Sequence, residues 1–197
     1  EISGAGEMSL IEKLGNEQYS LLTEKRKFRF LNPARILHKK NQLLILEALK
    51  EIKNSGNEMP QVVFLGYFDP NEPYMQELLR FIKNNALQAD CLFLGELDRK
   101  YLYEIYPLID SVILTSFSEG MPIVMVESVR FGKPFISTKV GGIPEIIQNG
   151  ETGLLVEFEA SDVAKAMTDL MQNIDLYSSI IMNSSSAYRD NFELEKI

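Results

Sequence analysis

The sequence predicts an α/β fold, a doubly wound parallel sheet of about six strands with helices on both faces. Two observations lead to this prediction. From Phe28 onward, short apolar or β-branched runs alternate with longer segments of helical periodicity, which is the pattern of repeated βα units. Several short runs end in glycine or small polar residues just before the next helical segment, as at Gly66 and Gly95. Such loops line ligand sites, because ligands bind beyond the carboxyl ends of the strands.

Each short run has the length and composition of a strand, and each intervening segment has the length of a helix. The expected strands are residues 28–33, 62–66, 91–95, 111–115, 134–138 and 153–156. The expected helices are residues 41–54, 73–85, 100–106, 122–131, 144–148 and 161–172. The first helix has a clear apolar stripe, to which Leu46, Leu49 and Ile52 belong.

The two ends of the chain differ from this pattern. Residues 1–27 carry Leu10, Ile11 and Leu14 on a possible helical turn, and no role is assigned to them. Residues 28–197 are expected to form one domain. Near the other end, apolar and aromatic residues recur at roughly helical spacing and predict a final helix with an apolar stripe; they are Tyr177, Ile181, Tyr188 and Phe192.

Length and composition fit one soluble domain. The chain has 197 residues, of which 45% are hydrophobic, so it can bury a sizeable core. No apolar run approaches the roughly 20 residues that a membrane span requires, and the first residues lack the features of a secretory signal. We therefore expect a cytoplasmic protein.

Residue counts argue against several kinds of site. The single cysteine, Cys91, lies in an apolar run and is expected to be a small core residue, and His38 is the single histidine. Neither a disulfide framework nor a cysteine or histidine metal site is expected, although counting leaves carboxylate sites open. The Gly-x-Gly-x-x-Gly and Gly-x4-Gly-Lys-Ser/Thr patterns are absent, which argues against an NAD domain and a P-loop ATPase. We expect no metal and no cofactor.

Charge is unevenly spread along the chain. The formal net charge of −8 argues against nonspecific nucleic-acid binding. A basic stretch nevertheless lies between Glu24 and Lys40, where seven Lys and Arg residues oppose Glu24 alone. Its residues 25–29 are either solvated surface or a peripheral contact with an anionic membrane. Arg35 and Lys40 belong to another motif.

Glu119 and Glu127 lie in the segment with the strongest chemical signal. Pro122 suits the first turn of a helix that Ser118 can cap. The helix then reads Ile-Val-Met-Val, apolar around its circumference, which predicts burial. Glu127 lies within it, and a buried carboxylate requires a hydrogen-bonding partner in the protein or in a ligand. Glu119 precedes the helix, where unpaired backbone N–H groups form an anion site.

Both glutamates have structural alternatives on residues alone. Glu119 could be an ordinary first-turn carboxylate, and Glu127 could pair with an arginine in the core. These alternatives stay open at this point.

The segment resembles the Glu-x7-Glu motif of the retaining GT-B glycosyltransferases often called family 4, also described as glycosyl transferases group 1. Glu119-Gly120-Met121-Pro122 and Glu127 match the motif in register, and the common Gly-Lys-Pro follows at residues 132–134. The resemblance runs from about Phe28 to Ile197 and includes residues 140–145, 149–156 and 192–197. It implies a Rossmann-like domain that binds a nucleoside-diphosphate sugar and forms one half of a GT-B enzyme.

The resemblance also implies residue roles. Glu119 would contact hydroxyls of the transferred sugar, and Glu127 would accept hydrogen bonds from the ribose hydroxyls. The family's paired arginine and lysine fall on Arg35 and Lys40. Two fixed cations there would stabilise the departing diphosphate in the transition state and replace a metal. As structural alternatives, Arg35 could pair with either glutamate in the empty protein, and Lys40 could be a surface residue.

Further donor contacts are expected in the loops. Backbone N–H groups of Gly120 and Met121 would face the diphosphate and sugar, and Ser118 is counted with them. Leu94 or Leu97 would lie against the nucleotide base, or Leu94 would be core. Gly141 and Gly142 either form a tight turn or let the backbone approach the ligand. The family's usual Gly-Asp-Gly-Pro is replaced at residues 66–70 by Gly-Tyr-Phe-Asp-Pro, which leaves no donor contact assigned there.

The resemblance implies partners that this chain does not contain. An N-terminal domain, absent here, would carry most of the acceptor site, so the chain alone should turn over poorly or not at all. The donor would be a UDP or GDP sugar, and the acceptor a glycan, a lipid-linked sugar or a small molecule. Two rivals remain: a nucleotide-sugar epimerase of the same fold, or a nucleotide-binding or interaction domain without catalysis.

Overall fold

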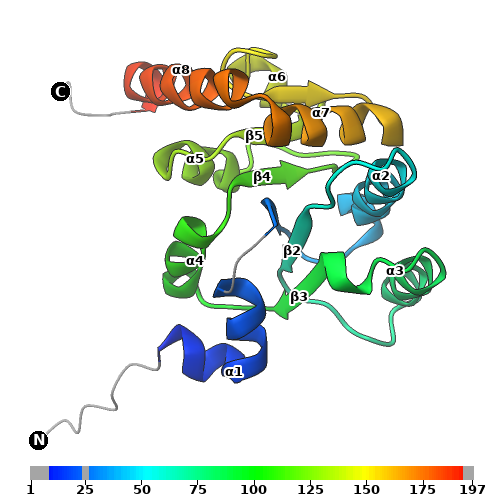
Figure 1. The fold of residues 1–197 in the computed structure, drawn as a ribbon. Coiled ribbons are helices and arrows are strands. Elements are labelled where there is room, and N and C mark those ends of the chain that lie inside the picture. Colours follow the sequence, from blue (N-terminus) through cyan, green and yellow to red (C-terminus); the bar gives the residue numbers. More distant parts are fainter. Residues whose placement is uncertain (1–8, 24–26, 193–197) are drawn as a thin grey trace, which may run out of the picture.

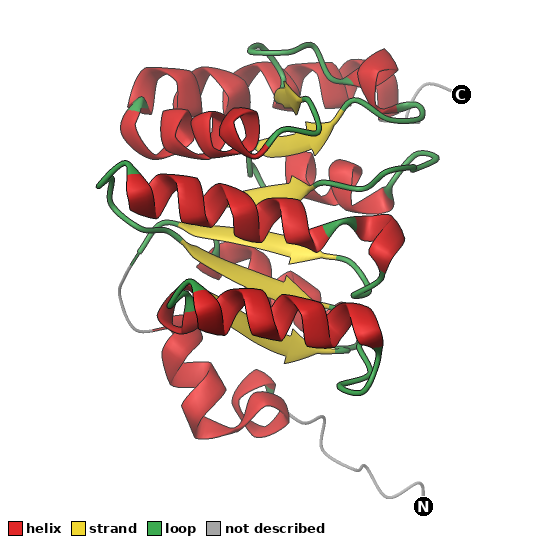
Figure 2. Cartoon of the chain, turned by 90° about the vertical axis from the view of Figure 1, so that its right-hand side faces the viewer, coloured by secondary structure: helices red, strands yellow, loops and turns green. Residues whose placement is uncertain are grey.

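The computed structural model describes residues 9–23 and 27–192, and it describes side chains up to residue 186. Its centre is a six-stranded sheet in the order β3-β2-β1-β4-β5-β6, in which neighbouring strands pair in parallel. In Figure 2 the arrows point the same way, so the carboxyl ends of the strands share one edge. The strands are β1 Arg29–Pro33, β2 Gln61–Leu65, β3 Cys91–Gly95, β4 Ser111–Leu114, β5 Phe135–Thr138 and β6 Leu154–Val156.

Helices cover both faces of this sheet (Figure 1). The α-helices are α1 Leu10–Thr23, α2 Gln42–Asn54, α3 Pro73–Asn84, α4 Arg99–Ile105, α5 Ile123–Arg130, α6 Ile143–Ile146, α7 Ala160–Gln172 and α8 Ile174–Phe192. Three 3-10 turns, η1 His38–Lys40, η2 Gln88–Asp90 and η3 Tyr106–Leu108, complete the connections. The predicted doubly wound α/β architecture is therefore confirmed.

The apolar residues form two clusters, one on each face of the sheet. One cluster joins strand residues such as Phe30 and Phe64 to α2, α3 and α7, which lie together in Figure 1. The other joins Leu31, Val63 and Leu65 to α1, α4, α5 and α6. Alternate residues of one strand serve opposite faces, because successive side chains of a strand point to opposite sides.

Strand order reverses between β1 and β4, and the two strands separate there. The pairing of β1 with β4 covers only Phe30–Ser111 and Leu31–Val112, whereas β1 pairs with β2 along its whole length. The buried amide of Asn32 spans the split and donates to the Ile113 carbonyl oxygen at 2.8 Å. A reversal of this kind opens the crevice in which α/β sheets bind ligands.

The predicted strands are confirmed to within one residue, and the predicted helices between them to within two. Cys91 packs against the first cluster, and burial raises the pKa of its thiol to about 12. A helix α8 is present, although the side chains of Tyr188 and Phe192 lie outside the described ones. The motif expected at residues 192–197 lies almost entirely outside the described residues.

The burial predicted for the helix after Pro122 is wrong in part. In α5 the residues Met125, Glu127 and Ser128 are buried, but Ile123 is 64% exposed. The reason is that α5 packs one side on the sheet while its amino-terminal turn stands at the carboxyl edge. No element in the described part of the chain covers Ile123 there.

The basic run at residues 25–29 is not simply solvated. Lys25 and Arg26 lie outside the described residues. Lys27 pairs with Asp90, and Arg29 is buried, with its Nε donating to Gln61 Oε1 at 2.9 Å. Two of the cations considered for a membrane contact, Lys27 and Arg29, thus bind other side chains of the domain. In the described ranges no helix is long and apolar enough to cross a membrane.

One buried hydroxyl gives a stability prediction. The Tyr106 side chain is fully buried, its ring stacks on Phe131 at 4.5 Å, and its hydroxyl has no hydrogen-bond partner among the described residues. Tyr106→Phe should raise the free energy of unfolding by about 1 kcal/mol, because it removes an unsatisfied polar group. The matched variant is Tyr177→Phe, which removes a hydroxyl that donates to the Asp110 carbonyl oxygen at 2.9 Å. Urea unfolding of the two variants should show a rise in the free energy of unfolding for Tyr106→Phe and a fall for Tyr177→Phe. Equal falls in both variants would contradict the prediction.

Candidate functional site

The loops after β1 and β4 meet at the carboxyl edge, where the strand order reverses. The loop after β1 passes through η1 and turns into α2 at Asn41, whose φ of 50° is left-handed. The loop after β4 is fastened to it at two points. Phe117 N donates to the Lys39 carbonyl oxygen at 2.9 Å, and Thr115 Oγ1 donates to the Asn41 carbonyl oxygen at 2.8 Å. Residues far apart in sequence are thereby held side by side.

Lys40 and Glu119 form an ion pair at this junction. Lys40 Nζ lies 2.7 Å from Glu119 Oε1, and Ser116 Oγ donates to the same oxygen at 2.5 Å. Only 10% of the Glu119 side chain is exposed. A charge-assisted pair with little solvent around it is stronger than a surface pair. The arrangement places a cation and a carboxylate in one small volume beyond the end of β4.

The loop after β5 packs against the backbone of Glu119. Gly141 has a φ of 56°, and a Cβ added there would lie 1.8 Å from the Glu119 carbonyl oxygen. Gly142 N donates to the Gly120 carbonyl oxygen at 3.3 Å. Gly141 is therefore required because its backbone crosses that of Glu119, a close approach within the protein that neither interpretation of this glycine pair included.

Glu127 is the second carboxylate of the site. It lies in the second turn of α5 and is 5% exposed. Its Oε1 accepts hydrogen bonds from Arg99 Nε at 3.1 Å and from Arg99 Nη2 at 2.8 Å. The prediction that a buried Glu127 needs a partner is met in this structure by Arg99. That arginine is the first residue of α4 and is mostly exposed, so it is not the core arginine that the sequence suggested.

Arg35 does not pair with either glutamate. Its side chain is exposed, and its guanidinium carbon lies 5.6 Å from the centre of the Tyr67 ring. No ion pair to Arg35 is found within residues 9–23 and 27–192. Its backbone carbonyl is held by the buried Gln42, whose Nε2 donates to it at 2.9 Å. The loop backbone is fixed, while the guanidinium has room to meet a ligand.

The remaining predicted residues divide between loop and core. Gly120 and Met121 lie exposed in the loop beside Glu119. Leu94 is buried in the second core cluster, as the alternative for this residue had it, and Leu97 is half-buried in the loop after β3. Of the two leucines, Leu97 is the one with surface to offer a ligand.

The capping prediction for Ser118 is wrong. The helix begins at Ile123 with Pro122 at the cap position, and no side chain caps it. Ser118 is exposed, four residues upstream of that cap. The loop runs longer than predicted because it must first place Glu119 between Lys40 and the crossing at Gly141.

Sequence reasoning missed an aromatic stack along the same edge. His38 lies between Tyr74 and Phe117 with ring centres 5.5 Å away in each case, and Phe117 stacks on Phe158 at 5.4 Å. The four rings come from four separate segments of the chain. No periodicity or motif signals such a cluster, because each ring is a single residue in its own segment.

Carboxylates in the site are matched with cations rather than with one another. Glu119 is paired with Lys40 and Glu127 with Arg99. Among the residues that the structure describes, no three His, Cys, Asp or Glu side chains are grouped so that they could hold a metal ion.

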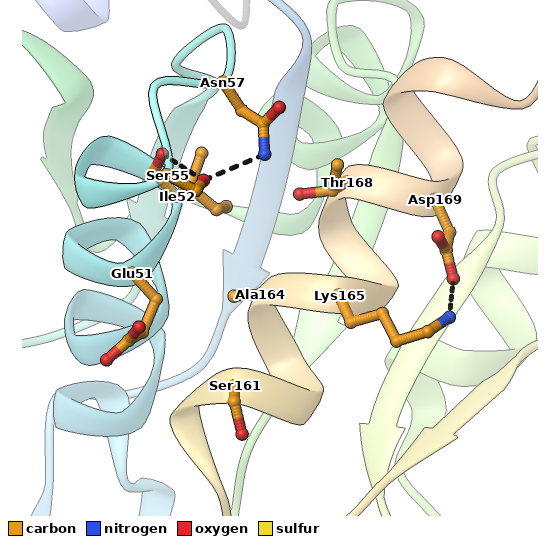
Figure 3. Close-up of a pocket in the computed structure, with 9 residues that line it drawn as sticks. All are labelled: Glu51, Ile52, Ser55, Asn57, Ser161, Ala164, Lys165, Thr168 and Asp169. Atoms are coloured by element: carbon orange, nitrogen blue, oxygen red, sulfur yellow. Dashed lines mark hydrogen bonds and ion pairs between the residues drawn. The ribbon is translucent and has the colours of Figure 1, made fainter.

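A separate pocket of ≈ 310 Å³ lies between α2 and α7 (Figure 3). Its wall includes the ion pair of Lys165 with Asp169 and the hydrogen bond from Asn57 Nδ2 to Ser55 Oγ at 2.9 Å. None of the predicted site residues lines it. For that reason this pocket is not the candidate site.

Most of the chain is similar to known proteins. Residues 16–186 match the family model described as glycosyl transferases group 1. N-acetyl-alpha-D-glucosaminyl L-malate synthase of Bacillus anthracis is 32% identical over 126 residues, which are 64% of this chain and 32% of that protein. The chain spans less than half the length of the curated relatives it matches first.

Two solved structures share the fold. HepE of Anabaena in complex with UDP-glucose superimposes with a TM-score of 0.79 at 22% identity, over 89% of this chain and 47% of that chain. The C-terminal domain of LpcC, a glycosyl transferase group 1 family protein of Francisella tularensis, gives 0.76 at 21% identity, over 92% of this chain and 100% of that chain. The Rossmann-like architecture predicted for half of a GT-B enzyme agrees with both.

Proposed function

Since the chain belongs to the glycosyl transferases group 1 family, we propose that it is the donor-binding half of a glycosyltransferase. The protein would move a sugar from a nucleoside-diphosphate sugar to an acceptor with retention of configuration. The observation that carries this proposal is the pairing of Lys40 with Glu119 at the reversal of the strand order, where α/β sheets bind ligands. Glu127 lies on the helix that follows.

The donor would use the two carboxylates differently. The ribose hydroxyls donate to Glu127, because a buried carboxylate is a strong acceptor for a vicinal diol. Hydroxyls of the transferred sugar donate to Glu119, and backbone N–H groups near Gly120 and Met121 face the diphosphate. The base rests beside Leu97. HepE, which shares the fold, was solved with UDP-glucose, and this supports a uridine or similar nucleotide here.

Arg35 and Lys40 would stabilise the leaving diphosphate. As the bond to the sugar breaks, negative charge grows on the phosphate oxygens, so fixed cations stabilise the transition state more than the ground state. Lys40 is already held in place by Glu119, and the exposed Arg35 lies in the same loop. Two cations so placed would do the work that a metal does in other transferases.

The acceptor would bind mainly to a second domain that lies outside this chain. The short span of the chain relative to its curated relatives supports this arrangement. The acceptor is a glycan, a lipid-linked sugar or a small molecule, and the reaction takes place in the cytoplasm, with contact to the membrane when the acceptor is lipid-linked.

Calorimetric titration with UDP, GDP, ADP and their sugars, with and without magnesium, tests the proposal. At least one nucleoside diphosphate should bind in the absence of magnesium. If none binds under either condition, the donor role is wrong, and strict dependence on magnesium would refute the role of Arg35 and Lys40 as its replacement.

Alanine variants of the two glutamates should change ligand affinity in different ways. Glu127→Ala should weaken the bare nucleoside diphosphate by about tenfold or more, since it removes hydrogen bonds to a charged acceptor. Glu119→Ala should leave the bare nucleotide nearly unchanged and weaken only the nucleotide sugar. The exposed carboxylate Glu77 on α3 supplies the control variant Glu77→Ala, which should change neither. Equal effects of the two site variants on both ligands would contradict the assigned roles.

A further inference from the structure

Arg99 occupies the acceptor oxygen that the proposed function gives to the ribose. Its Nε and Nη2 both donate to Glu127 Oε1, at 3.1 and 2.8 Å. The hydrogen bond with Glu127, and then the charge of that carboxylate, raise the pKa of Arg99. The guanidinium therefore stays charged and fills the site in the absence of ligand.

The two partners differ sharply in how firmly they are held. Glu127 is 5% exposed in the second turn of α5, whereas 63% of the Arg99 side chain is exposed. A buried carboxylate without a partner is costly, so the empty protein needs a cation at this position. Arg99 supplies it without being packed in place.

A second contact, with the ring of Tyr103, is available to Arg99 when it leaves Glu127. Its guanidinium carbon lies 5.8 Å from the centre of the Tyr103 ring, one turn further along α4. Arg130 of α5 lies over the same ring at 5.9 Å. A cation over an aromatic face is stabilised even when it is exposed, so Arg99 can give up the carboxylate and keep this contact.

We infer that Arg99 is a displaceable stand-in for the ribose, a residue that closes Glu127 in the empty protein and sets its affinity for nucleotides. The inference rests on the proposed function, in which Glu127 receives the ribose hydroxyls. The entering diol replaces the guanidinium at Glu127 Oε1, so the ion pair between Arg99 and Glu127 breaks each time a nucleotide binds. Arg99 thus weakens nucleotide binding and keeps the buried carboxylate paired when the donor is absent.

The direction in which Arg99→Ala changes the affinity for UDP tests this inference. Arg99→Ala should tighten the binding of UDP by about fivefold, the size expected for release of a largely exposed ion pair. In a Glu127→Gln background the same substitution should have no effect, since there is no carboxylate to uncover. Arg130→Ala is the matched control, because Arg130 is exposed and shares the Tyr103 ring. It should leave UDP binding unchanged.

Calorimetry of the four variants with UDP and GDP separates the outcomes. Tighter binding for Arg99→Ala only where Glu127 is present supports the inference. Weaker binding in both backgrounds would mean that Arg99 contacts the nucleotide itself and would overturn it, as would unchanged binding. These results leave the proposed function standing, whereas absence of nucleotide binding by every variant would overturn both.

A measurement without ligand guards against an effect on folding. Thermal unfolding of Arg99→Ala should occur at a lower temperature than that of the unchanged protein, and this difference should vanish in the Glu127→Gln background. If the loss of stability persists there, Arg99 has a structural role that does not pass through Glu127, and the inference fails.

Discussion

Gly141→Ala is expected to destabilise the domain by about 3 kcal/mol and to abolish donor binding, because overpacking against a fixed backbone is among the costly substitutions. The added Cβ would lie 1.8 Å from the Glu119 carbonyl oxygen. Glu119 is held on its other side by Lys40 and Ser116, so the loop cannot retreat without breaking that pair. Urea unfolding measures the loss of stability, and titration with the nucleotide sugar measures the loss of donor binding.

Gly150→Ala separates the clash from the backbone conformation. Gly150 has a φ of 80°, but a Cβ added there meets nothing within 4 Å. Its cost should be about 1 kcal/mol, the strain of a left-handed residue alone. Donor binding should survive in this variant. Similar losses in the two alanine variants would mean that the crossing of Gly141 with Glu119 is not a tight contact.

Lys40→Ala is expected to slow turnover by about a hundredfold to a thousandfold, the effect of removing one preorganised group that stabilises developing negative charge. Nucleotide binding should fall by less, because the charge on the diphosphate grows only as the sugar leaves. The assay is release of nucleoside diphosphate from the nucleotide sugar by the full-length protein, with binding measured in parallel.

Lys39→Ala is the neighbouring control for this effect. The Lys39 side chain is exposed, and the loop uses only its backbone carbonyl, which accepts from Phe117 N. Its removal leaves net charge equal to that of Lys40→Ala. Equal losses of turnover in the two variants would show a general effect of surface charge and would remove Lys40 from the proposed mechanism.

Local patterns were sufficient to predict the sheet. Runs such as residues 111–115 have an apolar centre, here residues 112–114, because parallel strands are buried on both faces. The helices between them carry apolar stripes of helical period. Such signals lie within one segment and can be read directly. Helix α1 was missed beyond a single turn because Gly15, with a φ of 76°, interrupts it and leaves two short pieces.

The site was predictable where a motif covers neighbouring residues and unpredictable where contacts join distant ones. Glu119, Gly120 and Glu127 share one segment and one register. Arg99 and Glu127, which pair in the structure, are 28 residues apart in the sequence, and no spacing rule links them. The family resemblance placed Lys40 in the site, yet its pairing with Glu119 follows only from the meeting of two loops.

The error at Ser118 has the same origin. A serine followed by a proline and an apolar run is a good local signal for a helix start. The signal failed because the loop after β4 is fixed by long-range bonds, among them Thr138 Oγ1 to the Ser116 carbonyl oxygen at 2.7 Å. Those bonds, and not a cap, determine where α5 can begin.

Helix α1 lies against β3, the outermost strand on its side of the sheet (Figure 1). Leu10, Leu14 and Leu22 are buried, and Gln18 Nε2 donates to the Phe93 carbonyl oxygen of β3 at 3.1 Å. A shortened chain beginning at Phe28 would lose α1 and leave the outer edge of β3, including the Phe93 carbonyl oxygen, without this cover. An uncovered strand of this kind pairs with a strand of another molecule, so that product would self-associate and precipitate even with its nucleotide site intact.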